Sequence, residues 1–531
     1  MSSWIKRTAL AAVATAALMG AMGAASAEVV YNRGNLGEPE TLDTHKTSTV
    51  QEAHILRDML EGLVAYNAKG EAVPGQAEKW EVSDDGKTYR FTLRQGLKWS
   101  NGDPVTAEDF VFSYRRIMDP ATGAKYANIL YPIKNSEKIN KGQGKPEELG
   151  VKAVDARTVE ITLEAPTPYF IELLTHQTSL PVHKASVEKF GKDFVKPGNM
   201  VSNGAYKLVE FAPNSHIKLA KNENYWDAKN VQIDTVNFIP HPDLAAAVRR
   251  YEAGELDSMD ELPADQIKSL KERFKDQVKL GPYLGTWFFV VNSSKAPFND
   301  VRVRQALSMA IDREFIAGEI WGQTMQPGYS FMPPGVGNYG EPAYMEYKDQ
   351  SPIDREDKAK ALLQEAGFGA GKPLKVQIRY NTTDNNRNSV IAIADQWKQI
   401  GVETSFINTD GKTHFAHLRD GGDFDIARYG WIADYSDPNN FLFLVKSDNK
   451  GFNYGKYNSP EFDKLLDDAA KELDLKKRAD MMKKAEAILM KDMPWIPIMY
   501  YGKSNLISPK IKGFVQNTRG VYPSRFLSKA Q

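Results

Sequence analysis

The stretch from residue 374 to residue 431 alternates short apolar segments with longer amphipathic ones, and this pattern limits the possible folds more than any other feature. It predicts strands at about 374–380, 402–408 and 424–431, separated by helices at about 387–400 and 412–419. Strands that alternate with helices form a mainly parallel sheet with right-handed crossovers. Ligands of such sheets lie beyond the carboxyl ends of the strands, and residues 428–431 form one such end.

The rest of the chain predicts a mixed α/β protein with more than one lobe. Further predicted elements are a hairpin at 78–94, a helix after Thr106, a strand pair at 152–163, short strands within 200–245, helices at 299–321, 354–366 and 473–491, a helix after Ser459, and an irregular, partly extended tail. A chain of 531 residues is too long for one hydrophobic core. We therefore expect two or three lobes.

The first 27 residues have the pattern of a secretory signal peptide. Lys6 and Arg7 precede an apolar, alanine-rich run, and Ala25-Ser26-Ala27 is a small-x-small cleavage site. A membrane anchor is the weaker interpretation, because the apolar run is shorter than the roughly 20 residues that cross a bilayer. Removing Lys6 and Arg7 from a chain with 68 basic and 68 acidic residues leaves a net charge near −2. That balance does not indicate a nucleic-acid partner.

The chain contains no cysteine. This excludes disulfides, thiol nucleophiles and cysteine-ligated metals. It also excludes the lipid-modified cysteine that tethers many exported proteins to a membrane. We therefore expect a periplasmic protein without a lipid anchor, whose core is large enough to do without disulfides.

Motifs of catalysis and cofactor binding are weak or missing. Residues 367–372 resemble a phosphate loop, but Ala366 and Pro373 stand where that motif needs glycine and serine or threonine. His414 and His417 share a helical face near Asp420 and Asp423, yet solvated surface histidines are commoner than such metal sites. We predict no catalytic residue, no cofactor and no metal site.

The most informative segment runs from residue 419 to residue 441 and contains the run Trp-Ile-Ala-Asp-Tyr at 431–435. Supporting stretches are Leu-Asp-Thr-His-Lys at 42–46, Leu-Lys-Trp-Ser-Asn-Gly-Asp-Pro-Val-Thr at 97–106, Asn-Gly-Ala-Tyr at 203–206 and Phe-Asn-Asp-Val-Arg-Val-Arg-Gln-Ala-Leu at 298–307. Together they resemble the oligopeptide-binding proteins of bacterial ABC importers, in the peptide/nickel group of solute-binding proteins. The resemblance covers the whole mature chain.

This resemblance implies a periplasmic-binding-protein-like, two-lobe α/β fold with three domains that closes on its ligand by a hinge motion. Domain I is expected at 28–62, 187–284 and 502–531, domain II at 63–186, and domain III at 285–501. The hinge is expected near residues 284 and 502, where the chain crosses between domains I and III.

The resemblance also implies roles for particular residues. Asp434 is expected to receive the α-ammonium group of a peptide, because a buried ammonium needs a fixed opposite charge. Arg428 and Arg419 match positions that meet the peptide carboxylate, which the planar guanidinium fork suits. The remaining expected contacts are strand-like backbone at Val50, Gly430 and Ile432, and pocket-lining side chains at Tyr126 and Trp431. The simpler alternatives are a surface ion pair between Asp434 and Arg428, and Trp431 as a core residue.

The sequence departs from the enteric members at several of these places. Their paired cysteines fall at Gly285 and Ile432. A lysine and a histidine that serve other ligand lengths are replaced by Trp321 and Asn386. A pocket tryptophan becomes Lys412, which predicts a preference for acidic side chains. We expect Trp321, Asn386 and Lys412 to line the binding pocket.

The implied function is the capture of peptides of about three to five residues and their delivery to inner-membrane permease subunits, by a monomer that is not an enzyme. One alternative is a receptor specialised for murein peptides, and another is a receptor for a different small solute of the superfamily. Two further alternatives are an exported hydrolase and a chaperone-like holdase.

Overall fold

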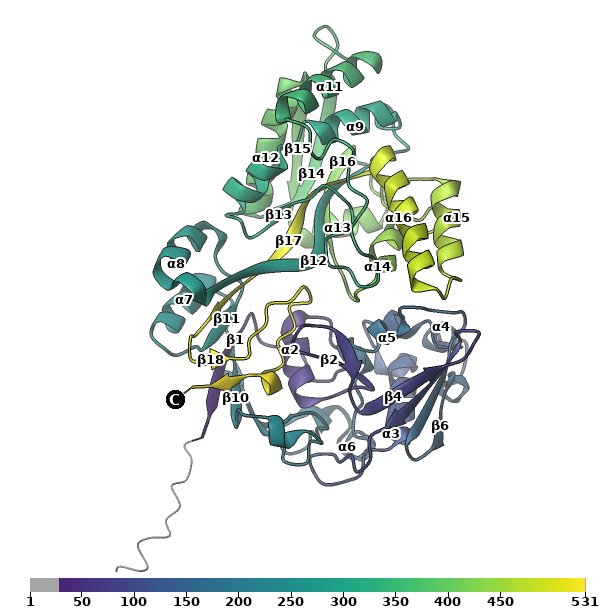
Figure 1. The fold of residues 1–531 in the computed structure, drawn as a ribbon, viewed down its shortest axis with the longest axis vertical. Helices are drawn as coiled ribbons and strands as arrows, with labels where there is room; N and C mark the ends of the chain where they lie inside the picture. The colour runs from purple at the N-terminus through teal and green to yellow at the C-terminus, as the bar shows by residue number, and fades with distance from the viewer. Residues whose placement is uncertain (1–27, 531) are drawn as a thin grey trace, which may run out of the picture.

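The computed structural model describes residues 28–530, and the predicted signal peptide at 1–27 lies outside the described residues. Figure 1 shows two lobes stacked along the long axis of the molecule. We call residues 285–501 the upper lobe, and residues 28–284 together with 502–530 the lower lobe. No helix within residues 28–530 is long and apolar enough to cross a membrane.

An eleven-stranded sheet runs through both lobes. Its order is β15 (Val402–Thr409), β14 (Leu374–Asn381), β16 (Ile426–Ile432), β12 (Val278–Val291), β17 (Trp495–Ile507), β11 (Ser258–Asp260), β1 (Val30–Asn35), β10 (Thr235–Pro240), β9 (His216–Lys221) and β8 (Tyr206–Ala212), with β13 (Gln326–Pro327) paired to β17. The antiparallel pair β12 and β17 passes from the lower to the upper lobe (Figure 1). Their register shifts between Pro282 and Thr286, close to the crossing.

The predicted strand–helix alternation is confirmed. The chain forms β14, α12 (Asp384–Gln399), β15, α13 (Gly411–Arg419) and β16 in that order. β14 lies between β15 and β16 and runs parallel to both. The sheet as a whole is mixed, because β12 is antiparallel to β16 and to β17.

The single helix predicted at 299–321 is wrong, whereas the other helices of the upper lobe follow their predictions closely. α9 (Val301–Met309) ends early, and a short α10 (Arg313–Phe315) continues into the π-helical turn η9 (Ile316–Ile320). The side chain of Asp312 accepts a hydrogen bond from the Phe315 amide and so starts a second helix. α11 (Pro352–Glu365), α15 (Pro460–Ala469) and α16 (Leu475–Asp492) also belong to this lobe. The tail predicted as irregular and partly extended contains the 13-residue strand β17.

The lower lobe contains a second, four-stranded antiparallel sheet. Its order is β4 (Ala77–Val82), β5 (Thr88–Leu93), β7 (Thr158–Thr162) and β6 (Val151–Asp155). Both the predicted hairpin and the predicted strand pair are therefore confirmed. Helix α3 (Ala107–Met118) begins with the predicted capping box of Thr106 and Asp109, and its buried Phe110 joins Phe91 of β5 in the core of this lobe.

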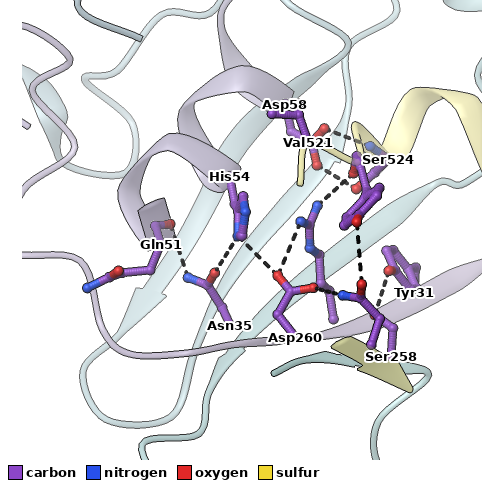
Figure 2. A network of polar contacts seen from close by, with 12 residues as sticks. Tyr31, Asn35, Gln51, His54, Asp58, Ser258, Asp260, Val521 and Ser524 are labelled. Atoms are coloured by element: carbon purple, nitrogen blue, oxygen red, sulfur yellow. Dashed lines mark hydrogen bonds and ion pairs between the residues drawn. The ribbon is translucent and has the colours of Figure 1, made fainter. Parts of the chain in front are cut away.

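A buried polar network joins distant segments of the lower lobe (Figure 2). Asp260 of β11 accepts a hydrogen bond from Asn505 of β17 at 2.6 Å, and its other oxygen lies 3.4 Å from Nδ1 of His54 in α2 (Val50–Met59). Burial holds the pKa of His54 well below its usual range, so the ring is neutral. Asn35 bonds His54 and also donates to the Gln51 carbonyl at 3.1 Å. The network therefore fixes the amino-terminal end of α2 against the crossing strand β17.

Candidate functional site

The carboxyl end of β16 has an open edge. β12 pairs with β16 on one side as far as Ile432. On the other side the pairing with β14 stops at Ala427. Among residues 28–530 no strand therefore pairs with residues 428–432 along that edge, and an extended chain could add there. Gly430 and Ile432, both predicted to bond a peptide backbone, lie in this stretch.

Gly430 is required by the close approach of a tyrosine. A Cβ atom at residue 430 would overlap the hydroxyl of Tyr501, which follows the buried start of β17. The same hydroxyl accepts a hydrogen bond from Nη2 of Arg428 at 2.8 Å. Tyr501 was not predicted from the sequence, and it connects the strand edge to the predicted carboxylate partner.

Asp434 follows β16 in a partly buried loop. Burial raises the pKa of its carboxyl group to about 6, and the nearby positive charge of Arg519 opposes that rise. Its backbone is held at two points, because Asn440 Oδ1 accepts from the Asp434 amide at 3.2 Å and Arg519 donates to the Asp434 carbonyl at 2.9 Å. Among residues 28–530 no donor bonds its carboxylate oxygens and no cation lies within 4.0 Å of them. A desolvated carboxylate with unused acceptors suits a ligand cation.

Tyr126 of the lower lobe lies close enough to this carboxylate to be affected by its charge. Burial and the negative charge of Asp434 both raise the pKa of the Tyr126 hydroxyl. The ring stacks on His176 at 5.4 Å between centroids, and burial lowers the pKa of His176 to about 3. Tyr126 is thus an aromatic residue of the lower lobe close to Asp434, and its role in lining a pocket stays a prediction.

The loop that carries Asp434 is also fixed by a buried ion pair. Asp437 receives two hydrogen bonds of 2.7 Å from the guanidinium of Arg478 in α16, and each side chain is 1% exposed. Tyr169 of the lower lobe stacks on Tyr435 at 5.1 Å and lies 5.4 Å from the same guanidinium. These contacts join the two lobes beside Asp434.

Arg428 is buried and lacks an acidic partner. Its guanidinium donates to Asn381 Oδ1 at 3.1 Å and to Tyr501, and it lies 5.2 Å above the ring of Trp287. No group within residues 28–530 forms a hydrogen bond with its Nε atom. In the part of the chain that the structure describes, no carboxylate lies within 4.0 Å, so the alternative of an ion pair between Arg428 and Asp434 is wrong. An unpaired buried guanidinium suits a ligand carboxylate.

Trp431 is half-buried and packs against the hydrophobic core of the upper lobe. Its Nε1 donates to Asn440 Oδ1 at 2.8 Å, and its ring makes edge contacts with Phe443 and Phe452. Ile432, the next residue, is 43% exposed at the strand edge.

The prediction of a strand-like segment at Val50 is wrong. Val50 is the first residue of α2 and not part of a strand-like segment. Thr49 and Glu52 form a capping box, with the Glu52 carboxylate accepting from the Thr49 amide at 3.0 Å. This Thr-x-x-Glu spacing was visible in the sequence and predicts a helix start. Val50 is 42% exposed, so any backbone contact there comes from the first turn of a helix.

Asn386 and Trp321 use their polar atoms within the upper lobe. Asn386 is 3% exposed, accepts from Trp287 Nε1 at 3.1 Å and donates to the Asn381 carbonyl at 3.1 Å. Trp321 Nε1 donates to Ser389 Oγ at 2.9 Å. Asn386 therefore holds Trp287 and Asn381, the two residues that Arg428 contacts, whereas Trp321 is held against α12. Lys412 belongs to α13, and its side chain is not among those that the structure describes.

Arg419 stands apart from this group. It is exposed at the end of α13 and lines a pocket of about 450 Å³ together with Tyr454 and Tyr457. No hydrogen bond or ion pair within residues 28–530 joins it to Arg428 or Asp434. The structure thus brings together Asp434, Tyr126 and Trp431 at one end and Arg428 at the other, without Arg419.

His414 and His417, which were considered as metal ligands, form hydrogen bonds to backbone carbonyl groups. His414 Nε2 bonds the Arg428 carbonyl at 2.7 Å and His417 Nε2 bonds the Asp423 carbonyl at 2.9 Å. Burial lowers the pKa of His414 to about 4. Across residues 28–530 no group of three metal-ligating side chains is close enough to hold an ion.

The chain is similar in sequence and in structure to bacterial solute-binding proteins. Residues 71–453 match the family model of bacterial extracellular solute-binding proteins, family 5, middle region. The chain is 40% identical over 530 residues to the periplasmic oligopeptide-binding protein OppA of Salmonella typhimurium, covering 97% of this chain and 96% of the relative.

Two solved structures extend this similarity. The unliganded open form of the periplasmic murein tripeptide-binding protein MppA has a TM-score of 0.87 at 38% identity, covering 95% of this chain and 98% of the other. Haemophilus influenzae OppA in complex with the peptide RPPGFSPFR has a TM-score of 0.76 at 37% identity, covering 95% and 99%. The protein therefore belongs to family 5 of the bacterial extracellular solute-binding proteins.

Proposed function

We propose that this protein is the periplasmic substrate-binding component of an ABC importer, and that it captures short peptides through their main chain and terminal charges. The observation that carries the proposal is the Asp434 carboxylate, which is partly buried, has no hydrogen-bond or ion-pair partner among residues 28–530 and lies close enough to Tyr126 to raise the pKa of its hydroxyl. A peptide α-ammonium group would supply the missing charge. Relatives named as periplasmic oligopeptide-binding proteins support the same class of ligand.

The spacing of the two charged residues supports a peptide of limited length. Asp434 and Arg428 are six positions apart. Because β16 ends at Ile432 and Asp434 lies in the bend that follows, the span is at most the roughly 20 Å of six fully extended residues. A pentapeptide extends over about 17 Å, and the arginine side chain shortens the gap that the ligand must bridge. A bound peptide of about three to five residues would lie along the open edge at 428–432, with its ammonium at Asp434 and its carboxylate toward Arg428.

The backbone of the ligand would carry most of the binding. Hydrogen bonds to an open strand edge do not depend on side chains, so one site accepts many sequences. Trp431, Tyr126 and the exposed Ile432 would provide broad apolar contacts for the side chains. Acidic side chains would be favoured if Lys412 enters this cleft.

The lobes would close over the ligand by rotation about the crossing strands near residues 284 and 502. In this proposal domain I comprises 28–62, 187–284 and 502–531, domain II 63–186 and domain III 285–501. Residues 1–27 would direct export and be removed. The mature monomer would then deliver its peptide to the inner-membrane permease subunits without altering it.

Thermal unfolding with and without ligand tests the central contact. Tripeptides to pentapeptides with free termini should raise the melting temperature of the wild-type protein, following RT ln(1 + [L]/Kd). Asp434→Asn should lose most of this shift, and N-acetylated peptides should fail with the wild-type protein. Asp84→Asn, at an exposed turn of the lower lobe, is the matched control. Equal stabilisation by acetylated and free peptides would contradict the ammonium contact.

A receptor specialised for murein peptides is the second candidate, because the periplasmic murein peptide-binding protein MppA of Escherichia coli is 39% identical to this chain over 493 residues. Mass spectrometry of ligand that co-purifies from the native host separates the two. A mixture of peptides with ordinary linkages supports a general receptor, whereas peptides with a γ-linked D-residue support the specialised one. Recovery of intact peptide after long incubation would count against a hydrolase.

A further inference from the structure

A loop of the upper lobe at residues 332–343 forms no helix or strand, and we call it the bridging loop. Among residues 28–530, no backbone-to-backbone hydrogen bond involves its amide or carbonyl groups. Val336 and Tyr339 of this loop are each 5% exposed and belong to the hydrophobic core of the lobe. Buried backbone groups need partners, so side chains have to hold the bridging loop in place.

The carboxylate of Glu486 in α16 holds both ends of the bridging loop. Its Oε1 accepts a hydrogen bond from the Met332 amide at 2.7 Å, and its Oε2 accepts one from the Ala343 amide at 2.8 Å. The hydroxyl of Tyr339, in the middle of the loop, donates to the same Oε2. Glu486 is 0% exposed. One buried carboxylate therefore closes the whole loop.

These hydrogen bonds offset part of the cost of burying Glu486. Burial raises the pKa of its carboxyl group to about 7, whereas the hydrogen bonds from Tyr339 and the two amides oppose the rise, as does the positive charge of Lys483. At pH 8 the carboxyl group is therefore ionised. Removing an ionised acceptor of this kind leaves the donors of the loop without a partner.

The middle of the bridging loop lies against the loop that carries Asp434. The Gly337 amide donates to Ser436 Oγ at 2.9 Å. A Cβ atom at residue 337 would lie only 2.8 Å from the Ser436 carbonyl oxygen, so the two backbones are in close contact. Ser436 follows Asp434 by two positions, and its place therefore limits the place of the carboxylate.

The bridging loop also contacts the lower lobe beside the arginine that holds Asp434. A Cβ atom at Gly335, whose φ is +89°, would lie 3.2 Å from Thr518 Cγ2. Thr518 directly precedes Arg519, which donates to the Asp434 carbonyl at 2.9 Å. The Thr518 carbonyl accepts from the Leu284 amide at the crossing between the lobes. The loop thus touches both segments that fix the ammonium site.

We infer that Glu486 is a positioning residue for the ammonium site, because it keeps the bridging loop against the two segments that hold Asp434. The inference rests on the proposed peptide-binding function. α16 then fixes this site twice, directly through the pair of Arg478 with Asp437 and indirectly through Glu486. Without Glu486, the loop that carries Asp434 gains freedom that a bound ammonium has to remove, and affinity falls.

Calorimetric titration with Ala-Ala-Ala at pH 8 tests this role. Glu486→Gln keeps the volume but only one acceptor oxygen, so one end of the bridging loop loses its bond, and the Kd should rise about three- to tenfold. Tyr339→Phe removes a hydrogen bond to the same carboxylate but leaves both ends bonded, and its Kd should stay within about twofold of wild type. Asp480→Asn, at an exposed acid of α16, controls for the change in net charge.

Hydrogen exchange of the free protein, followed by mass spectrometry, separates positioning from a general loss of stability. Glu486→Gln should speed exchange in residues 332–343 and in residues 433–440, and leave the hairpin at 78–94 of the lower lobe unchanged. Equal acceleration in all three segments, or acceleration in 332–343 alone, would show that Glu486 does not act on the ammonium site.

Ser436→Ala provides a second test that leaves Glu486 in place. It removes the acceptor of the Gly337 amide, so the Kd of Ala-Ala-Ala should rise by a similar factor, and this result decides the question if Glu486→Gln does not fold. The inference is wrong if wild-type protein binds the tripeptide and either variant binds it equally well. Failure of the wild type to bind any peptide with free termini would instead overturn the proposed function itself.

Discussion

The guanidinium of Arg519 donates to the backbone carbonyl of Asp434 at 2.9 Å and to that of Ala433 at 3.1 Å. Arg519 belongs to the lower lobe, where it also bonds the Tyr66 hydroxyl at 3.2 Å. Its positive charge lowers the pKa of Asp434 against the effect of burial. One half-buried arginine thus holds the backbone of the ammonium site and keeps its carboxyl group closer to the ionised state.

Arg519→Gln should weaken peptide binding most strongly at mildly acidic pH. Without the arginine the pKa of Asp434 rises further, so the fraction of ionised carboxylate near pH 6 falls. We expect about a tenfold loss of tripeptide affinity at pH 6 and a smaller loss at pH 8, measured by calorimetry. Arg519→Lys should retain the charge effect but lose part of the carbonyl contacts. Arg249→Gln, an exposed arginine of α7 (Leu244–Glu252), is the control. A loss of equal size at both pH values would contradict this role.

The wild-type protein should itself show a pH-dependent affinity. An ammonium ligand needs an ionised Asp434, whose pKa is about 6 in the free protein. Affinity should be constant above about pH 7 and fall below pH 6, approaching about tenfold per pH unit. The same titration with Asp434→Asn should be flat and weak. A wild-type affinity that stays constant from pH 7 to pH 5 would show that another group receives the ligand.

Asp434→Asn should stabilise the free protein at neutral pH. Because the pKa of Asp434 is raised to about 6 on folding, the folded state binds the proton more tightly than the unfolded state. Stability therefore falls as pH rises from about 4 to about 6. The variant lacks this loss, so its free energy of unfolding in urea should exceed that of wild type by about 1–2 kcal/mol at pH 7 and match it near pH 4. A variant that is less stable at pH 7 would contradict the burial argument.

Local sequence signals predicted much of the fold. The periodicity of residues 374–431 was sufficient for β14 to β16, because each element there has its own apolar pattern. β12 was not predicted, since Gly281, Pro282 and Gly285 interrupt its sequence and pairing with β17 forms it. Gly285 lies directly opposite Ile432, in keeping with the positions of the paired cysteines in the enteric members.

The candidate site was predicted less completely than the fold, because several of its residues come from distant parts of the chain. Asp434, Arg428 and Trp431 belong to one continuous segment with a specific motif. Arg519 is 85 residues away from Asp434 in the chain and has no motif of its own. Tyr169 reaches Tyr435 from the other lobe. Such contacts depend on how distant elements pack, and no local spacing encodes them.

Gly430→Ala should impair peptide binding through Tyr501. The added methyl group would overlap the Tyr501 hydroxyl, so the ring must move away from Arg428 and from the open strand edge. We expect at least a tenfold loss of tripeptide affinity, measured by calorimetry. The double variant Gly430→Ala/Tyr501→Phe should recover part of the affinity, because it removes the atom that clashes. Gly369→Ala, where a Cβ meets no atom within 4 Å, is the control.

The buried pair Arg478–Asp437 provides a test of how the ammonium loop is held. Burial raises the pKa of Asp437 and Arg478 opposes this rise, so neither charge is tolerated alone at this depth. Arg478→Met should cost about 3–5 kcal/mol in the free energy of unfolding, because it leaves an uncompensated carboxylate. The exposed pair Arg387–Asp384 is the matched control, and Arg387→Met should cost less than about 1 kcal/mol.

The double variant Arg478→Met/Asp437→Leu distinguishes a stabilising pair from one that fixes geometry. Apolar replacements of similar volume remove both desolvated charges, so most of the lost stability should return. The contact of Arg478 with the Tyr169 ring is lost in either case, and with it part of the link between the lobes beside Asp434. We therefore expect the double variant to unfold in urea nearly like wild type while its tripeptide affinity stays several-fold weaker. If the double variant recovered both the stability and the tripeptide affinity of the wild type, the pair would not position the loop. Its two charges would then only neutralise each other.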